Sequence, residues 1–338
     1  MQKYRIYGLL LVLMTLVGCR DMFIHEIDFE GETEPEMLVL TSTLEVGQTP
    51  EIQVSHSFFF NRTDKRPDDW ITDAQLTIHI NSQTYTLAYR DSGCYTNPSI
   101  PPLAPRDTVQ VVASHPKYAT ATAQQILPGQ IQAKVVSYEL QSGWLVFDLD
   151  IDAYEGNPDD VIAIHAAGRL KAMMLDNPVV LDMNILYSND IIFAQAQNAE
   201  AEGYYGVMYG GLLYFPASLL QQSRRIRLFL DSYKMQYESL DWYKDIQIAS
   251  LEVNVMACTQ AVYRFDQSQR DSYDAKYLPA PSGLPTQDEN VMQEIMDEIQ
   301  AMLGEQEPKL VYSNVDGGLG IVAGCSSSVC SYGSYVFL

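Results

Sequence analysis

Short runs of alternating apolar and polar residues cover most of the first half of the chain. Residues 74–80 and 85–89 alternate in this way, and the polar pair Asn81-Ser82 between them predicts a hairpin. Comparable runs occupy residues 37–43, 52–55, 108–113 and 119–123, with prolines in the segments between strands. Because successive side chains of a strand point to opposite faces, these runs predict about seven half-buried strands. Such a succession is typical of an immunoglobulin-like β-sandwich, which we place at residues 37–128.

A second β-rich region follows Pro128-Gly129, a pair that is typical of a joint between domains. Its apolar or alternating runs lie at residues 134–138, 144–152, 162–166, 191–194, 226–230 and 246–255. They predict a larger β-sandwich over residues 129–338. The expected fold is therefore mainly β, with two tandem β-sandwich domains.

Two or three helices are expected to accompany the second sandwich. Residues 260–273 carry apolar positions at helical spacing opposite a very polar side. Residues 286–303 begin with Thr286 and Glu289, which form a capping box, and continue with an apolar stripe that faces away from acidic positions. A short helix is expected after Pro216, at residues 218–222.

The N-terminus predicts a lipoprotein signal peptide over residues 1–18. A short cationic segment with Lys3 and Arg5 precedes an apolar run that is too short for a permanent membrane-spanning helix. The run ends in Leu16-Val17-Gly18-Cys19, which resembles the bacterial lipobox. That resemblance implies cleavage before Cys19 and attachment of palmitate-like acyl chains to it, and two or three chains anchor a protein stably.

Arg20 stands where an aspartate would imply retention at the inner membrane, so we expect the outer membrane, without preference for its periplasmic or outer face. Residues 19–36 are acidic and aperiodic, and predict a flexible tether. Loss of Lys3 and Arg5 with the signal moves the formal net charge from -22 to -24. Such an acidic chain is a poor candidate for binding nucleic acid or anionic lipid head groups.

Four cysteines remain besides Cys19, and export would place them in an oxidising compartment. Cys325 and Cys330 flank a loop-like run of small residues, so we predict a disulfide between them. Cys94 and Cys258 belong to different predicted domains, and we expect both to be free and buried.

The best metal candidate is the run Asp148, Asp150, Asp152, because alternate residues of a strand share one face and three carboxylates would repel without a cation. The sixth position of the calcium-loop pattern is Ala153 instead of glycine, and we favour a solvated strand face. Residues 204–215 are rich in tyrosine and glycine, which recur at binding surfaces, and this predicts either a binding surface or a hairpin over the core. The tyrosines concerned are Tyr204, Tyr205, Tyr209 and Tyr214.

Catalytic patterns are weak. The Gly-x-Ser-x-Gly motif is absent and the histidines are scattered without metal-ligand spacing, so we expect no enzyme and no cofactor. The glycine-rich run at residues 316–320 lacks the lysine and following helix of a phosphate loop, and instead predicts a tight turn or bulge beside a closing strand.

Several segments resemble a family of outer-membrane lipoproteins known as domain of unknown function 4249. They are residues 71–78, Gly93-Cys94-Tyr95, residues 147–152, residues 255–265 and, as the most specific, residues 311–321 with Ser313-Asn314 before Gly317-Gly318-Leu319-Gly320. The resemblance covers nearly the whole chain. This sequence departs from the family's pattern in its acidic insertion at residues 274–308, at Asp159-Asp160, and at its C-terminal cysteines.

The resemblance implies a non-catalytic accessory or binding protein that accompanies a TonB-dependent outer-membrane receptor, since family members tend to be encoded beside such receptors. A fimbrial anchor or subunit is one alternative, and predicts an unpaired edge strand or a groove for a donor strand. A surface carbohydrate- or peptide-active enzyme is the other, and predicts a deep pocket with converging carboxylates or a metal.

Overall fold

The structure is a computed structural model that describes residues 35–57, 70–174, 177–199, 212–232, 243–276 and 311–333. The expected signal peptide, Cys19, most of the tether and the expected helix at residues 286–303 lie outside these ranges. Within the described residues, strands form a 12-stranded sheet and a 4-stranded sheet. The mainly β class expected from the alternating pattern is therefore confirmed.

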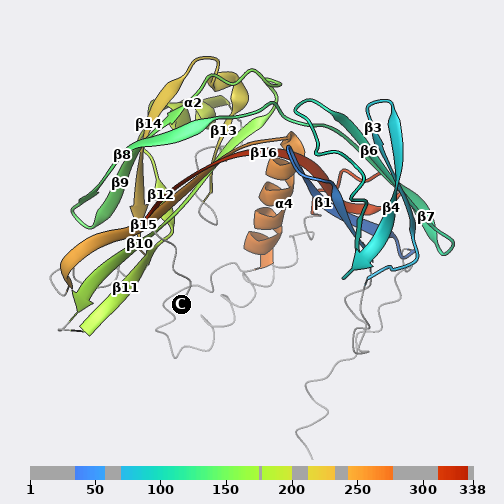
Figure 1. Cartoon of the computed structure of the whole chain (residues 1–338), viewed down its shortest axis with the longest axis horizontal. Coiled ribbons are helices and arrows are strands. Elements are labelled where there is room, and N and C mark those ends of the chain that lie inside the picture. The colour runs from blue at the N-terminus through green and yellow to red at the C-terminus, as the bar shows by residue number, and fades with distance from the viewer. Residues whose placement is uncertain are drawn as a thin grey trace, which may run out of the picture. The chain divides into compact units, whose positions relative to one another are not determined.

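The first sandwich is formed by strands from the N-terminal part of the chain (Figure 1). They are β1 (Leu38–Glu45), β2 (Glu51–His56), β3 (Gln75–Ile80), β4 (Gln83–Asp91), β5 (Cys94–Thr96), β6 (Thr108–His115) and β7 (Tyr118–Ile126). Leu38, Leu40 and Leu44 of β1 are buried at alternate positions, as the sequence pattern requires. β4 joins the two layers, because residues 83–87 pair with β3 and residues 88–91 pair with β5.

The second sandwich has two layers that share one hydrophobic core. One layer has the strand order β12-β14-β9-β8. It contains β8 (Ala133–Gln141), β9 (Trp144–Ile151), β12 (Ile185–Tyr187) and β14 (Arg224–Asp231). The facing layer contains β10 (Val161–Met174), β11 (Asn177–Met183), β13 (Leu212–Pro216) and β15 (Tyr243–Cys258). Inward side chains such as Phe147, Leu228 and Val253 fill the space between them.

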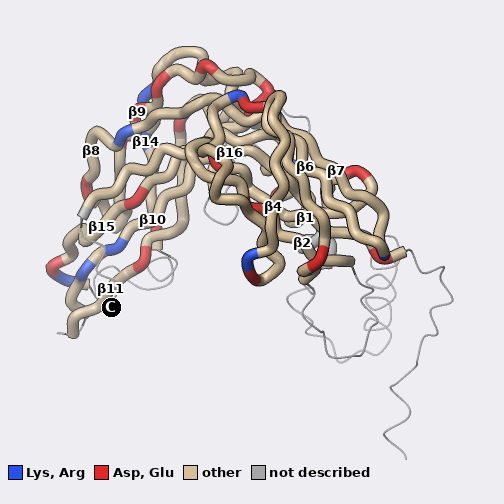
Figure 2. Tube along the Cα trace, turned by 45° about the vertical axis from the view of Figure 1, so that its right-hand side comes forward, with Lys and Arg blue, Asp and Glu red and all other residues tan. Residues whose placement is uncertain are grey.

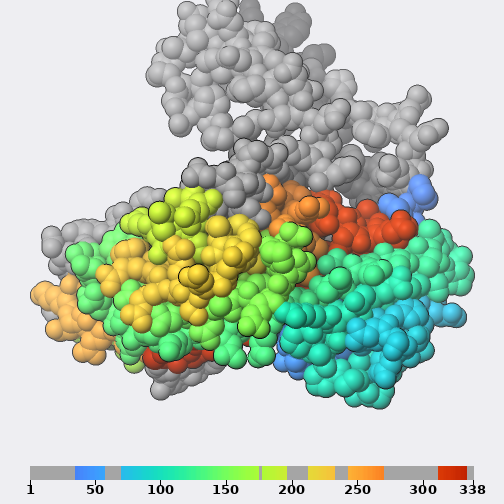
Figure 3. Space-filling model, turned by 90° about the horizontal axis from the view of Figure 1, so that it is seen from above, coloured from blue at the N-terminus to red at the C-terminus, as the bar shows by residue number. Residues whose placement is uncertain are grey.

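One long strand, β16 (Leu319–Gly333), belongs to both sandwiches. Its first half pairs parallel with β1, and its second half pairs antiparallel with β15. The two halves meet at Cys325, which is in register with Glu45 of β1 and with Cys258 of β15. Figure 1 shows this strand in red between β15 and β1, and in Figure 3 red surface lies against the teal strands of the first sandwich. The C-terminal segment, which the sequence assigns to the second domain, thus also completes the first.

The family-like segment before β16 is explained by backbone geometry. The side chain of Asn314 pairs with Val322 like a short strand: its Nδ2 donates to the Val322 carbonyl (2.7 Å) and its Oδ1 accepts from the Val322 N–H (2.9 Å). Gly317 and Gly320 have φ of +69° and +105°, a region that favours glycine. A Cβ on Gly320 would lie 2.1 Å from the carbonyl oxygen of Leu40 in β1. Of the two alternatives predicted for this segment, the tight turn beside a closing strand is therefore confirmed.

The helix expected at residues 260–273 is confirmed as α4 (Gln260–Lys276), which packs Ala261 on Ile321 and Ala323 of β16. A 3-10 helix at Ala217–Leu219 replaces the short helix expected slightly later. The strand predicted at residues 191–194 is wrong, because this segment is α2 (Ile191–Ala199). Asp190 starts the helix: its carboxylate accepts a hydrogen bond from the Ile192 N–H at 2.9 Å.

Candidate functional site

The candidate site starts from the hairpin that joins β8 to β9. Ser142 and Gly143 both have positive φ, +51° and +88°, as the two central residues of a type I′ turn do. This two-residue turn fixes Gln141 opposite Trp144. From there β9 alternates: Leu145, Phe147 and Leu149 enter the core, while Trp144 and the residues at 146, 148 and 150 face outward. The turn therefore sets which side chains the sheet presents to solvent.

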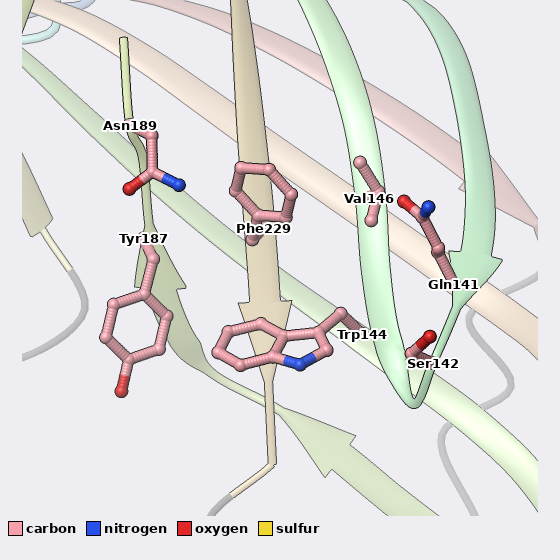
Figure 4. A pocket seen from close by; sticks show the side chains of 7 residues that line it. All are labelled: Gln141, Ser142, Trp144, Val146, Tyr187, Asn189 and Phe229. Atoms are coloured by element: carbon pink, nitrogen blue, oxygen red, sulfur yellow. The ribbon is translucent and has the colours of Figure 1, made fainter.

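An aromatic pocket of about 360 Å³ lies on this outward face. Val146, Phe229 and Tyr187 lie in one row across β9, β14 and β12, because the register places each directly beside the next. Trp144 packs edge-on against both rings, with centroid distances of 5.2 Å to Tyr187 and 6.4 Å to Phe229. Val146 is only 2% exposed, so it forms the floor beneath the rings. Figure 4 shows the three rings on adjacent strands.

Polar side chains surround the rings of the aromatic pocket. Gln141, Ser142 and Asn189 complete its lining (Figure 4). None of these three side chains makes a hydrogen bond to another residue in the part of the chain that the structure describes. Their amide and hydroxyl groups are therefore available to a ligand whose apolar part lies on the rings. This site was not predicted from the sequence, since its members come from four strands, β8, β9, β12 and β14.

Of the three aspartates considered as a metal site, Asp148 and Asp150 are on the outward face of β9 and each pairs with an arginine. Asp148 accepts two hydrogen bonds from Arg227 (2.8 and 3.0 Å), and Asp150 accepts two from Arg225 (2.6 and 2.9 Å). Figure 2 shows acidic and basic positions side by side where β9 meets β14. The hydrogen bonds from Arg227 lower the pKa of Asp148 to about 2, and those from Arg225 lower the pKa of Asp150.

These cross-strand ion pairs remove the reason for a cation, because each negative charge already has a positive partner. Asp152 is exposed beyond the end of β9. Among the described residues, no group of three or more metal-binding side chains converges. The alternating Arg225-Ile226-Arg227 pattern was the sequence signal for this arrangement, since it has the same period as the aspartates.

A buried polar pair holds the joint between the sandwiches. The hydroxyl of Tyr154 donates to Asp160 at 2.5 Å and accepts from the N–H of Gly129 at 2.7 Å. Tyr154 and Asp160 are 8% and 4% exposed. Burial raises the pKa of Asp160, and burial together with the bond to Asp160 raises the pKa of Tyr154. The pair stabilises the Pro128-Gly129 joint, because the Tyr154 hydroxyl is hydrogen-bonded to both the Gly129 backbone and the Asp160 carboxylate.

Asp160→Asn is expected to raise the thermal stability of the protein at neutral pH. The amide oxygen still accepts the Tyr154 hydroxyl, but no charge is buried. Because the folded-state pKa of Asp160 is raised, the native state keeps a proton that the unfolded chain releases near pH 4, and stability falls as the pH rises above that value. The gain should therefore vanish near pH 3. Thermal unfolding at both pH values, with exposed Asp152→Asn as control, measures this; a loss of stability at pH 7 would contradict it.

The disulfide predicted between Cys325 and Cys330 is wrong. Their sulfur atoms are not bonded to each other, and both residues belong to the continuous strand β16. Five residues of extended strand separate their Cα atoms by roughly 16 Å, whereas a disulfide needs about 4–7 Å. Cys258 is buried, as expected, whereas Cys94 is only partly so; neither is bonded to another cysteine in the structure. The small residues between the two C-terminal cysteines suggested a loop, but antiparallel pairing with β15 keeps them extended.

Tyr214 is the only described member of the tyrosine group, since Tyr204, Tyr205 and Tyr209 lie outside the described residues. It belongs to β13, is 1% exposed, and donates a hydrogen bond to Asp266 at 3.0 Å. Its assignment to a binding surface is therefore wrong. β13 pairs antiparallel with β10 in the same sheet, and its Leu213, Tyr214 and Phe215 are buried.

Comparison with known families decides where this chain belongs. The family described as "Domain of unknown function (DUF4249)" matches residues 24–330. The chain belongs to this family. The resemblance drawn from the segments around residues 71–78 and 311–321 is thus confirmed, and the DUF4249 match includes both sandwiches and the aromatic pocket. No curated protein matches the chain.

Solved structures give distant similarities only. The collagen binding domain of Erysipelothrix rhusiopathiae surface protein RspB aligns at 8% identity and a TM-score of 0.18, covering 65% of this chain and 87% of that one. The B domain of a biofilm associated protein aligns at 7% identity and a TM-score of 0.17, covering 66% and 81%. Scores this low carry no conclusion about the DUF4249 chain. In the described residues, no helix is both long and apolar enough to cross a membrane.

Proposed function

We propose that this DUF4249 protein is a non-catalytic binding protein, anchored to the outer membrane through acylated Cys19, that serves a TonB-dependent receptor. The observation that carries the binding role is the aromatic pocket: the rings of Trp144, Tyr187 and Phe229 lie together on one sheet, with polar side chains beside them. The anchoring role rests on the lipobox at residues 16–19. The receptor association rests on the family, whose members accompany such receptors.

The chemistry of the pocket favours binding over catalysis. Among the described residues, its lining contains aromatic, aliphatic, amide and hydroxyl side chains, and no carboxylate, histidine or cysteine that would serve as a general base or nucleophile. The carboxylates nearest to it along β9 are each held by an arginine. Asp160, whose pKa is raised, is buried against Tyr154 and directed at the joint. The shifted pKa values of Asp148, Asp150 and Asp160 are each explained by burial or by a neighbouring side chain, which supports a non-catalytic role.

The ligand that suits the aromatic pocket has an apolar face and polar edges. Tryptophan and tyrosine faces pack well against such a surface, while Gln141, Ser142 and Asn189 offer donors and acceptors at the rim. A sugar ring presents this combination, because its C–H groups form one face and its hydroxyls the edge. We therefore propose that the pocket contacts a neutral oligosaccharide.

The arrangement of β1 closes one position at which a fimbrial subunit could accept a donor strand, whereas β7 and β11 end the larger sheet among the described strands. A subunit that accepts a donor strand needs an unpaired strand edge or an open groove. β1 is paired on one side with β2 and on the other with the chain's own β16. The position beside β1 is therefore already filled from within the same chain.

The receptor association is tested by cross-linking whole cells and recovering the intact, tagged lipoprotein from solubilised outer membranes. A TonB-dependent receptor should be recovered in amounts comparable to the bait. The control is Cys19→Ala, which blocks acylation and should leave the chain as a precursor that no longer fractionates with the outer membrane. Absence of such a receptor from the recovered material would contradict the proposal, and recovery of fimbrial subunits would favour the fimbrial alternative.

A further inference from the structure

Two cysteines from different segments meet at the strand shared by both sandwiches. Cys258 ends β15 and Cys325 lies midway along β16, and the register places them directly opposite each other. Their sulfur atoms are 3.7 Å apart, and the residues are 2% and 3% exposed. Directly opposed residues of an antiparallel pair have Cα atoms about 4.5–5.5 Å apart, which lies within the range that a disulfide accepts.

We propose that Cys258 and Cys325 form a disulfide in the exported protein. The reaction is thiol–disulfide exchange with an envelope oxidoreductase that carries a disulfide. One cysteine thiolate attacks that disulfide, gives a mixed disulfide and releases one oxidoreductase thiolate; the second cysteine thiolate then displaces the other. The protein loses two hydrogen atoms as it gains the S–S bond, and the oxidoreductase is reduced to two thiols.

The other cysteines do not compete for either partner. Cys330 is five residues along β16 from Cys325, too far for a bond, and its thiol donates to the carbonyl of Ala133 at 3.2 Å. Cys94 is on β5, which is separated from β16 by β1 and β2 in the sheet, a distance of roughly 14 Å at the usual strand spacing. Among the cysteines that the structure describes, Cys258 and Cys325 are therefore the pair in reach of each other.

The bond would lie where the two sandwiches meet, so it would stabilise both of them. Cys325 is the residue at which β16 passes from β1 to β15, and its carbonyl accepts a hydrogen bond from the N–H of Val46 in the first sandwich. A disulfide there fastens β15 to the shared strand where the two sandwiches meet. It also closes a loop of 67 residues, which restricts the unfolded chain.

Burial determines when the bond forms. In the folded reduced protein, the hydrogen bond between the Cys258 thiol and the Cys325 sulfur, together with burial, raises the pKa of Cys258, so the reactive thiolate is disfavoured. The sulfur atoms are also shielded from a protein oxidant by the surrounding strands. We therefore expect oxidation before β15 and β16 close, during folding after export, and we expect the finished bond to resist reductants unless the protein is unfolded.

The test is differential alkylation of the protein purified from cell envelopes. Denaturation with an alkylating agent but no reductant should modify Cys94 and Cys330 and leave Cys258 and Cys325 unmodified until a reductant is added. Peptide mapping should recover the two peptides joined and lighter by two hydrogen atoms. Alkylation of all four cysteines without reductant would overturn the proposal, as would a bond between any other pair.

Stability provides a second measurement. The oxidised protein should melt roughly 5 °C or more above the same protein after reduction under denaturing conditions and refolding with reductant. Cys258→Ala should abolish this difference and leave Cys325 open to alkylation in the denatured protein, whereas Cys94→Ala should leave the difference unchanged. Equal melting temperatures of the oxidised and reduced proteins would contradict the proposal that the bond stabilises the pairing of β15 with β16, even if the bond is found.

Discussion

Gly320→Ala is expected to destabilise the protein by about 3 kcal/mol or more. Gly320 has a φ of +105°, which alanine adopts only with strain, and the new Cβ would lie 2.1 Å from the carbonyl oxygen of Leu40. That oxygen belongs to the backbone of β1, so it cannot move away without breaking the pairing between β1 and β16. Because β16 serves both cores, the loss should reduce the stability of the whole folded unit.

The matched control for this substitution is Gly47→Ala. Gly47 also has a positive φ, +87°, but a Cβ added there would meet no other atom within 4 Å. Its substitution should cost only the backbone strain, about 1 kcal/mol. Urea unfolding of both variants measures the difference in the free energy of unfolding. Equal costs for the two glycines would mean that the contact with β1 does not matter.

Trp144→Ala is expected to weaken oligosaccharide binding by roughly tenfold or more, since the loss of a ring-stacking contact costs about 1.5 kcal/mol or more. The ring packs edge-on against both Tyr187 and Phe229, so its removal opens the centre of the aromatic pocket. The fold should remain, because Trp144 faces outward and the core side of β9 is unchanged.

The binding measurement is isothermal titration with neutral oligosaccharides of glucose, xylose and N-acetylglucosamine. Tyr89→Ala is the control: Tyr89 is 42% exposed and also packs edge-on against another ring, that of Tyr95, but it lies in the first sandwich. It should bind like the wild-type protein. Equal binding by Trp144→Ala would exclude the pocket, and the absence of binding to all three oligosaccharide types would exclude this ligand class.

The strands and α4 were predictable because their signals are local. Alternation marks each strand, as in β3 and β4, and helical spacing marks α4. The strand prediction at residues 191–194 failed because two adjacent isoleucines favour a strand, whereas the N-terminal cap formed by Asp190 stabilises helix α2. The ionic pairs, the aromatic pocket and the Cys258–Cys325 contact were not predictable, since each depends on the register between strands far apart in sequence.

β16 shows the same limit at the scale of domains. The sequence predicts a closing strand beside the turn at residues 316–320 but neither its length nor its partners, and a boundary at Pro128-Gly129 assigns it to one domain. Pairing with both β1 and β15 makes the first sandwich depend on the end of the chain. The assignment of Tyr214 to a binding surface failed for a similar reason, because ring density in sequence does not determine which side of a strand faces solvent.

The central claim, that a lipid-anchored chain presents this pair of sandwiches at the outer membrane, is tested most directly by mass spectrometry of the N-terminal peptide. The protein would be extracted from isolated outer membranes and digested. We predict a chain that begins at Cys19 and carries acyl groups on its sulfur and on its amino group. A chain that begins at Met1, or one that begins at an unmodified Cys19, would contradict the account.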